Sequence, residues 1–263
     1  MVVSGSGALG RVVCMDKVVS SAAEAVADLG DGASIAVGGF GLCGVPLTLI
    51  DAVYAAGASE LSIVSNNCGT IGLGLGRLLD AGRITRARGS YVGENKELAR
   101  RYLGGEIELE LMPQGTLSEK LRAGGCGIPA FYTPAGVGTL VADGGLPWRY
   151  GPDGEVAVAS PPKEVREFGG REYVLEESIT TDFALVRAVR GDRHGNLVFH
   201  RSARNFNPLC AMAARTAVAE VEELVDAIDP DEVHLPGIFV QRVVALTPEQ
   251  AADKPIEKRT VTK

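Results

Sequence analysis

The stretch from Gly32 to Ala56, GASIAVGGFGLCGVPLTLIDAVYAA, is typical of a strand, a glycine-rich turn and a helix in one continuous piece. Ser34 to Val37 are short and mostly apolar, as in a buried strand, and Pro46 suits the first position of a helix that Gly57 caps. We expect the turn to leave backbone amides free at a helix N-terminus, where an anion or a developing negative charge could be held. The turn consists of Gly38, Gly39, Phe40, Gly41, Leu42, Cys43 and Gly44.

Within this turn Gly39, Gly41 and Gly44 also have the spacing of the dinucleotide-binding fingerprint. In that fold an acidic residue ends the second strand and binds a ribose hydroxyl. Here the second expected strand, Leu61 to Val64, ends in Ser65-Asn66-Asn67, with no carboxylate at its tip. Nicotinamide-cofactor binding and a purely structural turn therefore stay as alternatives, and a different use of the same strand, turn and helix is favoured.

Composition limits the classes of protein to which the chain can belong. With 263 residues, of which 46% are hydrophobic and 22% charged, it can bury the core of one large α/β domain or two small ones. Thirty-three acidic and 26 basic residues give a net charge of −7, and no basic stripe is present, so nucleic acid is not an expected partner. No apolar run reaches the roughly 20 residues of a membrane-spanning helix, so no membrane partner is expected either.

Five cysteines without a CxxC pair indicate a reducing, cytoplasmic compartment. No histidine lies at ligand spacing from them, so no metal site is expected. Cys43 could be activated at a helix N-terminus, but no histidine is near it in sequence, and a small buried filler is the favoured interpretation. The histidines, which form neither a metal cluster nor a triad and are interpreted as structural, are His194, His200 and His234.

Units of strand, loop and helix follow one another over the first half of the chain, which predicts parallel strands joined by right-handed crossovers. Before them, Ser21 opens a helix that should carry Val26 and Leu29. After the first unit, strands are expected at Leu61 to Val64, at Ile84 to Val92 and in EIELELMP from Glu106, with helices around Arg77 to Asp80, at Lys96 to Leu103 and from Thr116.

The middle third is rich in proline, glycine and β-formers, which predicts antiparallel hairpins turning at Gly151 to Gly154 and at Gly169-Gly170. Another strand pair should turn around Asp192 to Asn196, Asn207-Pro208 should start a helix, and TAVAEVEELV and GIFVQRVVAL should be late strands. The predicted fold is α/β, an open and mostly parallel sheet with helices on both faces plus an antiparallel hairpin insert. We expect a disordered extension over 1–14, one domain over 15–246, and a charged tail over 247–263 that hangs free or reaches a partner.

Ligands of an open parallel sheet bind beyond the carboxyl ends of its strands. The edge loops there offer free amides, the side-chain amides of Asn66, Asn67 and Gln114, and the carboxylate of Glu94. Such donors could hold an oxyanion during acyl transfer, each contributing roughly 3 kcal/mol. No nucleophile is obvious: Glu94 and Glu97 could be a catalytic carboxylate and its neighbour, but the helix dipole by itself favours acids in the first turn of a helix. The four edge loops are Gly38 to Gly44, Ser65 to Gly69, Gly93 to Asn95 and Pro113 to Gly115.

Five motifs in order make a more specific pattern: GGFGLCGVP at Gly38, SNN at Ser65, SYVGENKE at Ser90, PQGTLSEKLRAGGCGIPAFYTPAGVGT from Pro113, and SARNFNPL from Ser202. Together they resemble the A (alpha) subunit of the class I CoA-transferases, most closely the succinyl-CoA:3-oxoacid type, from roughly residue 16 to residue 245. The insert PPKEVREFGGREYVLEESI favours the 3-oxoacid type over the shorter acetate or butyrate enzymes. One departure from the family is Leu47, where an acidic residue commonly follows the proline, and we expect it to alter local capping.

The resemblance implies a ping-pong transfer of CoA from succinyl-CoA to acetoacetate, with the CoA thioester as substrate and no resident cofactor. The attacking glutamate lies on a partner, the B (beta) subunit, in a Ser-Glu-Asn-Gly motif whose counterpart here is Ser65-Asn66-Asn67. Gln114 and Asn66 or Asn67 would then be amide donors facing that glutamate, and Gly38 to Gly44 would contact CoA. Activity would require this partner, in an A2B2 heterotetramer. The alternatives are the corresponding chain of an acetate or butyrate:acetoacetate transferase and a noncatalytic nucleotide-binding protein of the same fold.

Overall fold

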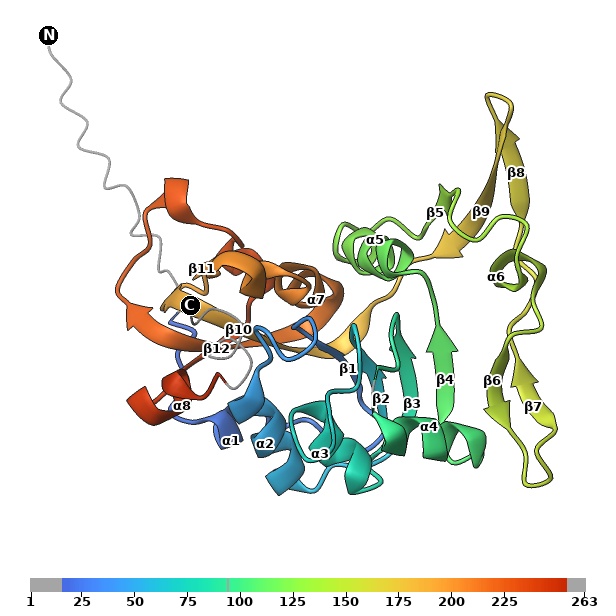
Figure 1. Ribbon diagram of the computed structural model, residues 1–263. Helices are drawn as coiled ribbons and strands as arrows, with labels where there is room; N and C mark the ends of the chain where they lie inside the picture. Colours follow the sequence, from blue (N-terminus) through green and yellow to red (C-terminus); the bar gives the residue numbers. More distant parts are fainter. Residues whose placement is uncertain (1–15, 94, 255–263) are drawn as a thin grey trace, which may run out of the picture.

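The central element of the computed structural model, which describes residues 16–93 and 95–254, is a parallel sheet ordered β13-β12-β10-β1-β2-β3-β4 (Figure 1). All neighbours on this path pair in parallel, and the short β11 (Leu197–Val198) adds an antiparallel edge to β10. The strands are β1 (Ser34–Val37), β2 (Leu61–Val64), β3 (Ile84–Gly89), β4 (Glu108–Leu111), β10 (Thr181–Asp192), β12 (Ala214–Val225) and β13 (Arg242–Ala245).

The strand order reverses its direction next to β1. From β1 the chain builds outward through β2, β3 and β4, whereas β10 pairs with the other edge of β1 and leads outward through β12 and β13. Ligands in such sheets bind where the order reverses, beyond the carboxyl ends of the strands. The glycine turn that follows β1 therefore lies at the position where the fold favours a site.

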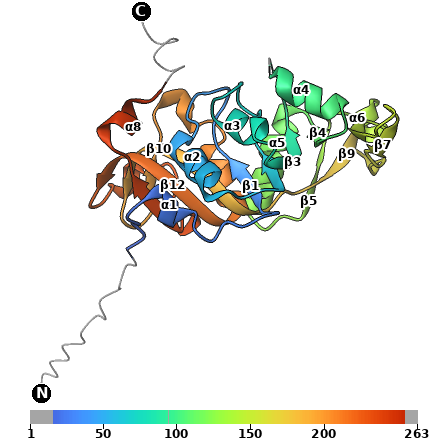
Figure 2. The same cartoon turned by 90° about the horizontal axis from the view of Figure 1, so that it is seen from below.

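Two hydrophobic cores, one on each face of the sheet, follow from the alternation of side chains along the strands. In β1, Ile35 and Val37 pack toward α1 to α4, whereas Ala36 packs toward α5 and α7. Figure 1 shows α1 to α4 on one face of the sheet and α5 and α7 on the other, and Figure 2 looks onto the side of α1 to α4; this arrangement confirms the predicted α/β architecture. The helices are α1 (Ala22–Ala25), α2 (Leu47–Ala56), α3 (Leu75–Asp80), α4 (Lys96–Leu103), α5 (Gln114–Gly125) and α7 (Asn207–Ala213).

The antiparallel insert lies beyond β4, at the end of the molecule opposite β12 and β13 (Figure 1). One small sheet has the order β5-β9-β8 and turns at Gly169 and Gly170, and a second pairs β6 with β7, so both predicted hairpins are confirmed. Buried Glu176 of β9 contacts Lys120 of α5 at 2.8 Å and thereby ties the insert to the body. The elements are β5 (Ala130–Thr133), α6 (Leu140–Asp143), β6 (Pro147–Tyr150), β7 (Val156–Ala159), β8 (Val165–Phe168) and β9 (Arg171–Glu177).

Four expectations about element bounds are wrong. The helix expected from Thr116 already begins at Gln114. The first helix ends at Ala25 rather than near Leu29. The carbonyl of Ala25, its last residue, accepts a 2.7 Å hydrogen bond from Arg242. The third strand ends at Gly89, and GIFVQRVVAL forms a 3-10 turn, Gly237–Phe239, before the short β13. In the two strand segments tertiary contacts override the local β-propensity, because the amide of Ser90 bonds to the carbonyl of Asn66 at 3.1 Å and that of Gly237 to Asn196 Oδ1 at 2.8 Å.

The segment from Thr247 does not hang free over its described part, and that expectation is corrected. Helix α8 (Pro248–Ala252) opens with a capping box between Thr247 and Gln250. Arg187 of β10 donates hydrogen bonds to the carbonyls of Gln250 and Ala251 at 3.3 and 3.0 Å. The predicted extension 1–14 and the remainder of the tail, 255–263, lie outside the described residues.

Candidate active site

The glycine turn closes on itself at the end of β1. Phe40 and Cys43 exchange backbone hydrogen bonds of 3.0 Å, which places Gly41 and Leu42 at the tip. Gly41 has φ +60°, in the left-handed region, so a side chain there would be strained even though space is open. The turn leaves the ring of Phe40 46% exposed above the edge of the sheet.

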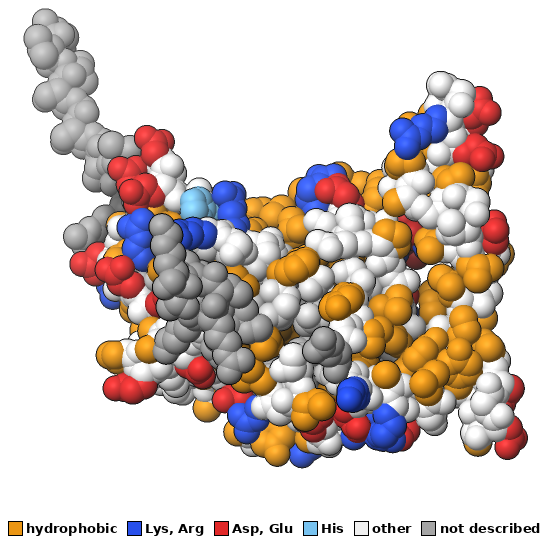
Figure 3. All heavy atoms as spheres, in the orientation of Figure 1, with side chains coloured by type: hydrophobic (Ala, Val, Ile, Leu, Met, Phe, Trp, Pro, Cys, Tyr) orange, Lys and Arg blue, Asp and Glu red, His pale blue; other side chains and the backbone are white. Residues whose placement is uncertain are grey.

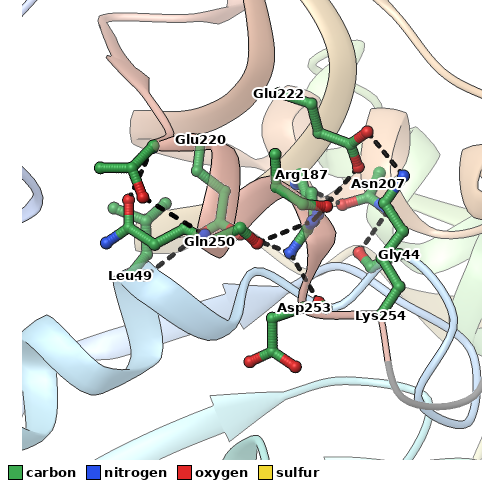
Figure 4. Close-up of polar contacts among 11 residues, drawn as sticks. Gly44, Leu49, Arg187, Asn207, Glu220, Glu222, Gln250, Asp253 and Lys254 are labelled. Atoms are coloured by element: carbon green, nitrogen blue, oxygen red, sulfur yellow. Dashed lines mark hydrogen bonds and ion pairs between the residues drawn. The ribbon is translucent and has the colours of Figure 1, made fainter.

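The expectation that the turn leaves its amides free is wrong for four of them. The amides of Phe40 and Cys43 bond within the turn, that of Gly38 donates to the carbonyl of Leu185 at 3.0 Å, and that of Gly41 donates to Asn66 Oδ1 at 3.3 Å. In the first turn of α2, the amide of Leu49 donates to Glu220 Oε2 at 2.9 Å (Figure 4). The side-chain carboxyl group of Glu220, from β12, thus already occupies this helix N-terminus, where a dinucleotide phosphate would bind, so the geometry disfavours the nicotinamide alternative.

Glu220 also supplies the acidic cap that Leu47 does not. It is fully buried, and Arg187 Nη1 lies 3.3 Å from its other oxygen. Burial raises the pKa of Glu220 to about 8, an effect that the neighbouring guanidinium, which favours the charged form, only partly offsets. Arg187 further contacts Glu222 at 3.2 Å, and Lys254 contacts the same carboxylate at 2.6 Å (Figure 4). The end of α8 is thereby fastened beside the glycine turn.

The two asparagines that follow β2 connect neighbouring loops. Asn66 is 3% exposed, and besides accepting from Gly41 it donates to Ser90 Oγ at 2.9 Å. Asn67 accepts from the amide of Gly69 at 3.0 Å and lines a narrow crevice beside the glycine turn. Both the donor and the acceptor of the Asn66 amide therefore serve to hold the edge loops together.

Gln114 lies on the most open part of this edge. It is the first residue of α5, it is exposed, and within the described chain no side chain caps the helix at Pro113. The first turn of α5 thus lines a cavity of about 320 Å³, and its first amides have no side-chain cap. The cavity is lined by Phe40, Gln114, Gly115, Ser118, Asn205, Phe206 and Leu209.

This cavity brings together two predicted residues, Phe40 and Gln114, with the motif SARNFNPL, which contains none of the predicted site residues. Asn205 lines the cavity and donates a hydrogen bond to the carbonyl of Cys43 at 3.1 Å. The signal for it in the sequence was the run SARNFN, in which the charged Arg204 is the more conspicuous residue. The lining offers amides and one hydroxyl, and none of the described residues that line it carries a carboxylate or a thiol.

The other candidates that the structure describes do not line this cavity. Cys43 is partly buried, with its Sγ 3.6 Å from Ser202 Oγ, and His234 Nδ1 accepts from the amide of Phe199 at 3.0 Å. Glu94 lies outside the described residues, and Glu97 pairs with arginines of its own helix. In the described ranges no group of three or more His, Cys, Asp or Glu side chains could hold a metal ion, and no helix is long and apolar enough to cross a membrane.

A second cavity of about 380 Å³ lies between the sheet and the insert, and several of the charges that line it are paired with one another. Glu176 accepts from Lys120 at 2.8 Å and from Lys163 at 2.5 Å, and Glu110 contacts Arg88 at 3.2 Å. This pairing makes the second cavity part of the junction with the insert. The amide-lined cavity at the sheet edge is the candidate active site.

Comparison with known proteins matches the chain to one family. The family model of coenzyme A transferase covers residues 19–246. The chain is 64% identical, over 94% of its length and 99% of the relative's, to a protein of Mycobacterium bovis named as the probable A subunit of succinyl-CoA:3-ketoacid coenzyme A transferase. It is 52% identical to the human mitochondrial succinyl-CoA:3-ketoacid coenzyme A transferase 2, over 94% of this chain and 48% of the human one.

A solved structure has the same fold. The acyl-CoA transferase YdiF apoenzyme from Escherichia coli O157:H7 superposes with a TM-score of 0.71 at 24% identity, covering 91% of this chain and 48% of that one. The family match spans the sheet, the insert and every residue of the amide-lined cavity. The chain therefore belongs to the coenzyme A transferase family.

Proposed function

We propose that this chain is the A subunit of a 3-oxoacid CoA-transferase that moves CoA from succinyl-CoA to acetoacetate. The observation that carries the proposal is the amide-lined cavity at the start of α5, which offers hydrogen-bond donors but no carboxylate from the described chain. The names of the 64% and 52% identical relatives support the choice of substrates. A second polypeptide, the B subunit, would bring the attacking carboxylate to this cavity.

The proposed reaction proceeds in balanced steps. The partner's glutamate attacks the thioester carbonyl of succinyl-CoA, and CoA leaves as a thiolate. The glutamate and the succinyl group are then joined in a mixed anhydride. The thiolate then attacks the glutamyl carbonyl of the anhydride, which releases succinate and leaves a glutamyl-CoA thioester. Acetoacetate repeats the sequence in reverse, taking the CoA and freeing the glutamate. Each attack creates an oxyanion, which donors fixed in advance stabilise most effectively.

In this scheme Gln114 and the first amides of α5 provide the donors. A twelve-residue helix adds the partial positive charge of its N-terminus to the same point. Phe40 and the turn from Gly38 to Gly44 would contact the CoA part of the substrate across the cavity. Asn66 and Asn67 would support the turn and the loop after β2, in accordance with the hydrogen bonds that they make there.

The B subunit would cover the edge of the sheet that carries these loops. Large hydrophobic side chains are exposed there, Phe40 by 46% and Tyr91 by 59%, and further hydrophobic surface lies on the side of the insert (Figure 3). The human relative is about twice the length of this chain, which leaves room for a B-like half in one polypeptide. We propose an A2B2 assembly in the cytoplasm, where buried thiols such as Cys68 and Cys210 stay reduced.

The experiment that tests the function is a reconstitution. The chain is purified alone and together with the product of a neighbouring reading frame that carries Ser-Glu-Asn-Gly, and acetoacetyl-CoA formation from succinyl-CoA and acetoacetate is followed. We expect turnover only when both polypeptides are present. Full activity of the isolated chain would contradict the proposal and would make Glu94 the first residue to examine.

A further inference from the structure

A single buried amide contacts three parts of the backbone around the glycine turn. Asn207 is the first residue of α7 and is fully buried. Its Oδ1 accepts from the amide of Arg187 at 3.0 Å, and its Nδ2 donates to the carbonyls of Gly44 at 3.0 Å and Ala203 at 2.8 Å. Figure 4 draws its side chain beside Arg187 and Gly44. One side chain thus joins β10, the end of the turn and the segment before α7.

These bonds lie where β1 leaves the sheet. The amide of Gly38 makes a 3.0 Å hydrogen bond to the carbonyl of Leu185 on β10. Two residues further along β10, the amide of Arg187 bonds to the Asn207 side chain instead of to backbone that would continue β1. Asn207 Oδ1 therefore takes the place of a β1 carbonyl as the acceptor for the amide of Arg187. The chain can turn away at Gly38 without leaving this buried donor unpaired.

Close packing explains why the turn begins and ends with glycine. A Cβ added to Gly38 would lie 1.9 Å from Asn207 Oδ1, so glycine is required there for space. A Cβ added to Gly44 would lie 2.8 Å from the carbonyl oxygen of Ala203 and 3.0 Å from Asn207 Nδ2. Both ends of the turn are held against the same side chain.

We propose that Asn207 is a positioning residue, which acts on the transfer reaction by fixing the conformation of the turn from Gly38 to Gly44. The inference rests on the function proposed above, in which this turn contacts the CoA part of the substrate. Asn205, two residues before Asn207, bonds to the carbonyl of Cys43 at 3.1 Å and lines the same cavity as Phe40. A shift of the turn would consequently change the cavity wall that receives the substrate.

The first arm of the test is kinetic. Asn207→Asp keeps an acceptor for the amide of Arg187 but sets a second oxygen against the carbonyls of Gly44 and Ala203. In the complex with the B subunit we expect kcat/KM for succinyl-CoA to fall by at least about tenfold, with the larger change in KM, under conditions where circular dichroism confirms folding. If this variant does not fold, Asn207→Ser, which replaces the amide by a smaller hydroxyl group, takes its place.

The control and the second arm separate positioning from plain destabilisation. Asn196→Ala removes hydrogen bonds to Asp192 and Gly237 in the β10–β11 turn, so it should lower the melting temperature and leave kcat/KM unchanged. Gly38→Ala should strongly lower the melting temperature of the isolated chain, but much less so when Asn207→Ala is already present, because the clashing oxygen has been removed.

The outcomes are distinguishable from those of the proposed function. Unchanged kinetics in a folded Asn207→Asp or Asn207→Ser complex, or additive losses from Gly38→Ala and Asn207→Ala, would overturn the inference. An inactive wild-type complex would instead overturn the proposed function. In that case the melting-temperature cycle, which needs no activity, still decides whether Asn207 holds the turn.

Discussion

Glu220 offers a direct test of how the start of α2 is held. Replacing it by glutamine keeps the shape of the side chain and an oxygen for the amide of Leu49, but removes the possibility of a negative charge. Because the carboxyl group is fully buried beside Arg187, the substitution acts on a site from which water is excluded. The substitution should therefore alter how the free energy of unfolding depends on pH, and should change its value at low pH much less.

The sign follows from the direction of the pKa change. Burial raises the pKa of Glu220 from 4.5 to about 8, so the folded chain holds a proton that the unfolded chain releases. The stability that this group contributes is fully present below pH 4.5 and is lost as the pH rises toward 8, by up to about 1.4 kcal/mol for each pH unit. The pKa of carboxylates such as Asp28 and Asp182 is lowered instead, so the stability that they contribute is present at neutral pH and is lost only in more acidic solution.

The assay is urea unfolding of the isolated chain and of Glu220→Gln at pH 5, 6, 7 and 8. We expect the free energy of unfolding of the wild type to fall with pH more steeply than that of the variant, by about 1 kcal/mol for each pH unit. Parallel pH profiles would refute the reasoning. A variant that is less stable than the wild type by about 3–5 kcal/mol at pH 8 would show instead that Glu220 is ionised and paired with Arg187.

Three further predictions concern the cavity, the junction with the insert and the C-terminal segment. Gln114→Ala should lower kcat of the complex with the B subunit about 10²-fold, because it removes a donor to the oxyanion. The control, Glu119→Gln on the exposed side of α5, should leave kcat unchanged. An unchanged kcat of Gln114→Ala would leave Gln114 with a structural role only. Glu176→Ala should cost about 3–5 kcal/mol in urea unfolding because it leaves the ammonium of Lys120 buried without its partner, and a loss below 1 kcal/mol would contradict this. Truncation before Pro248 should cost at least about 2 kcal/mol, since it removes the carbonyls that bond a buried guanidinium, and an unchanged urea midpoint would contradict the role given to α8.

The elements that the sequence predicted well are those determined by neighbouring residues. Helix α4 begins and ends as expected because Asn95 caps it through a 3.0 Å bond to the amide of Leu98, and because Gly104 follows Leu103. The strand, turn and helix around Gly38 were readable for the same reason, since Gly57 adopts the left-handed conformation that ends α2. Such signals lie within a few residues of the feature they specify.

What the sequence could not reveal depends on residues far apart along the chain. Glu220 accepts from the amide of Leu49, 171 positions earlier, so the amides of α2 looked free. The tail looked unattached because its carbonyls are held by Arg187, more than 60 positions before them. Asn207 was recognised as a helix start, but its contacts with Gly38 and Gly44 required the fold. No local pattern of charge or hydropathy predicts these pairings.

The most direct test of the account locates the covalent intermediate. The complex of this chain with the B subunit is mixed with succinyl-CoA without an acceptor, quenched, digested and examined by mass spectrometry for a peptide that carries CoA on a glutamate. The account predicts the CoA adduct only on the partner polypeptide, with every peptide of this chain unmodified. A CoA-bearing glutamate in this chain would contradict the claim that it supplies the hydrogen-bond donors while its partner supplies the nucleophile.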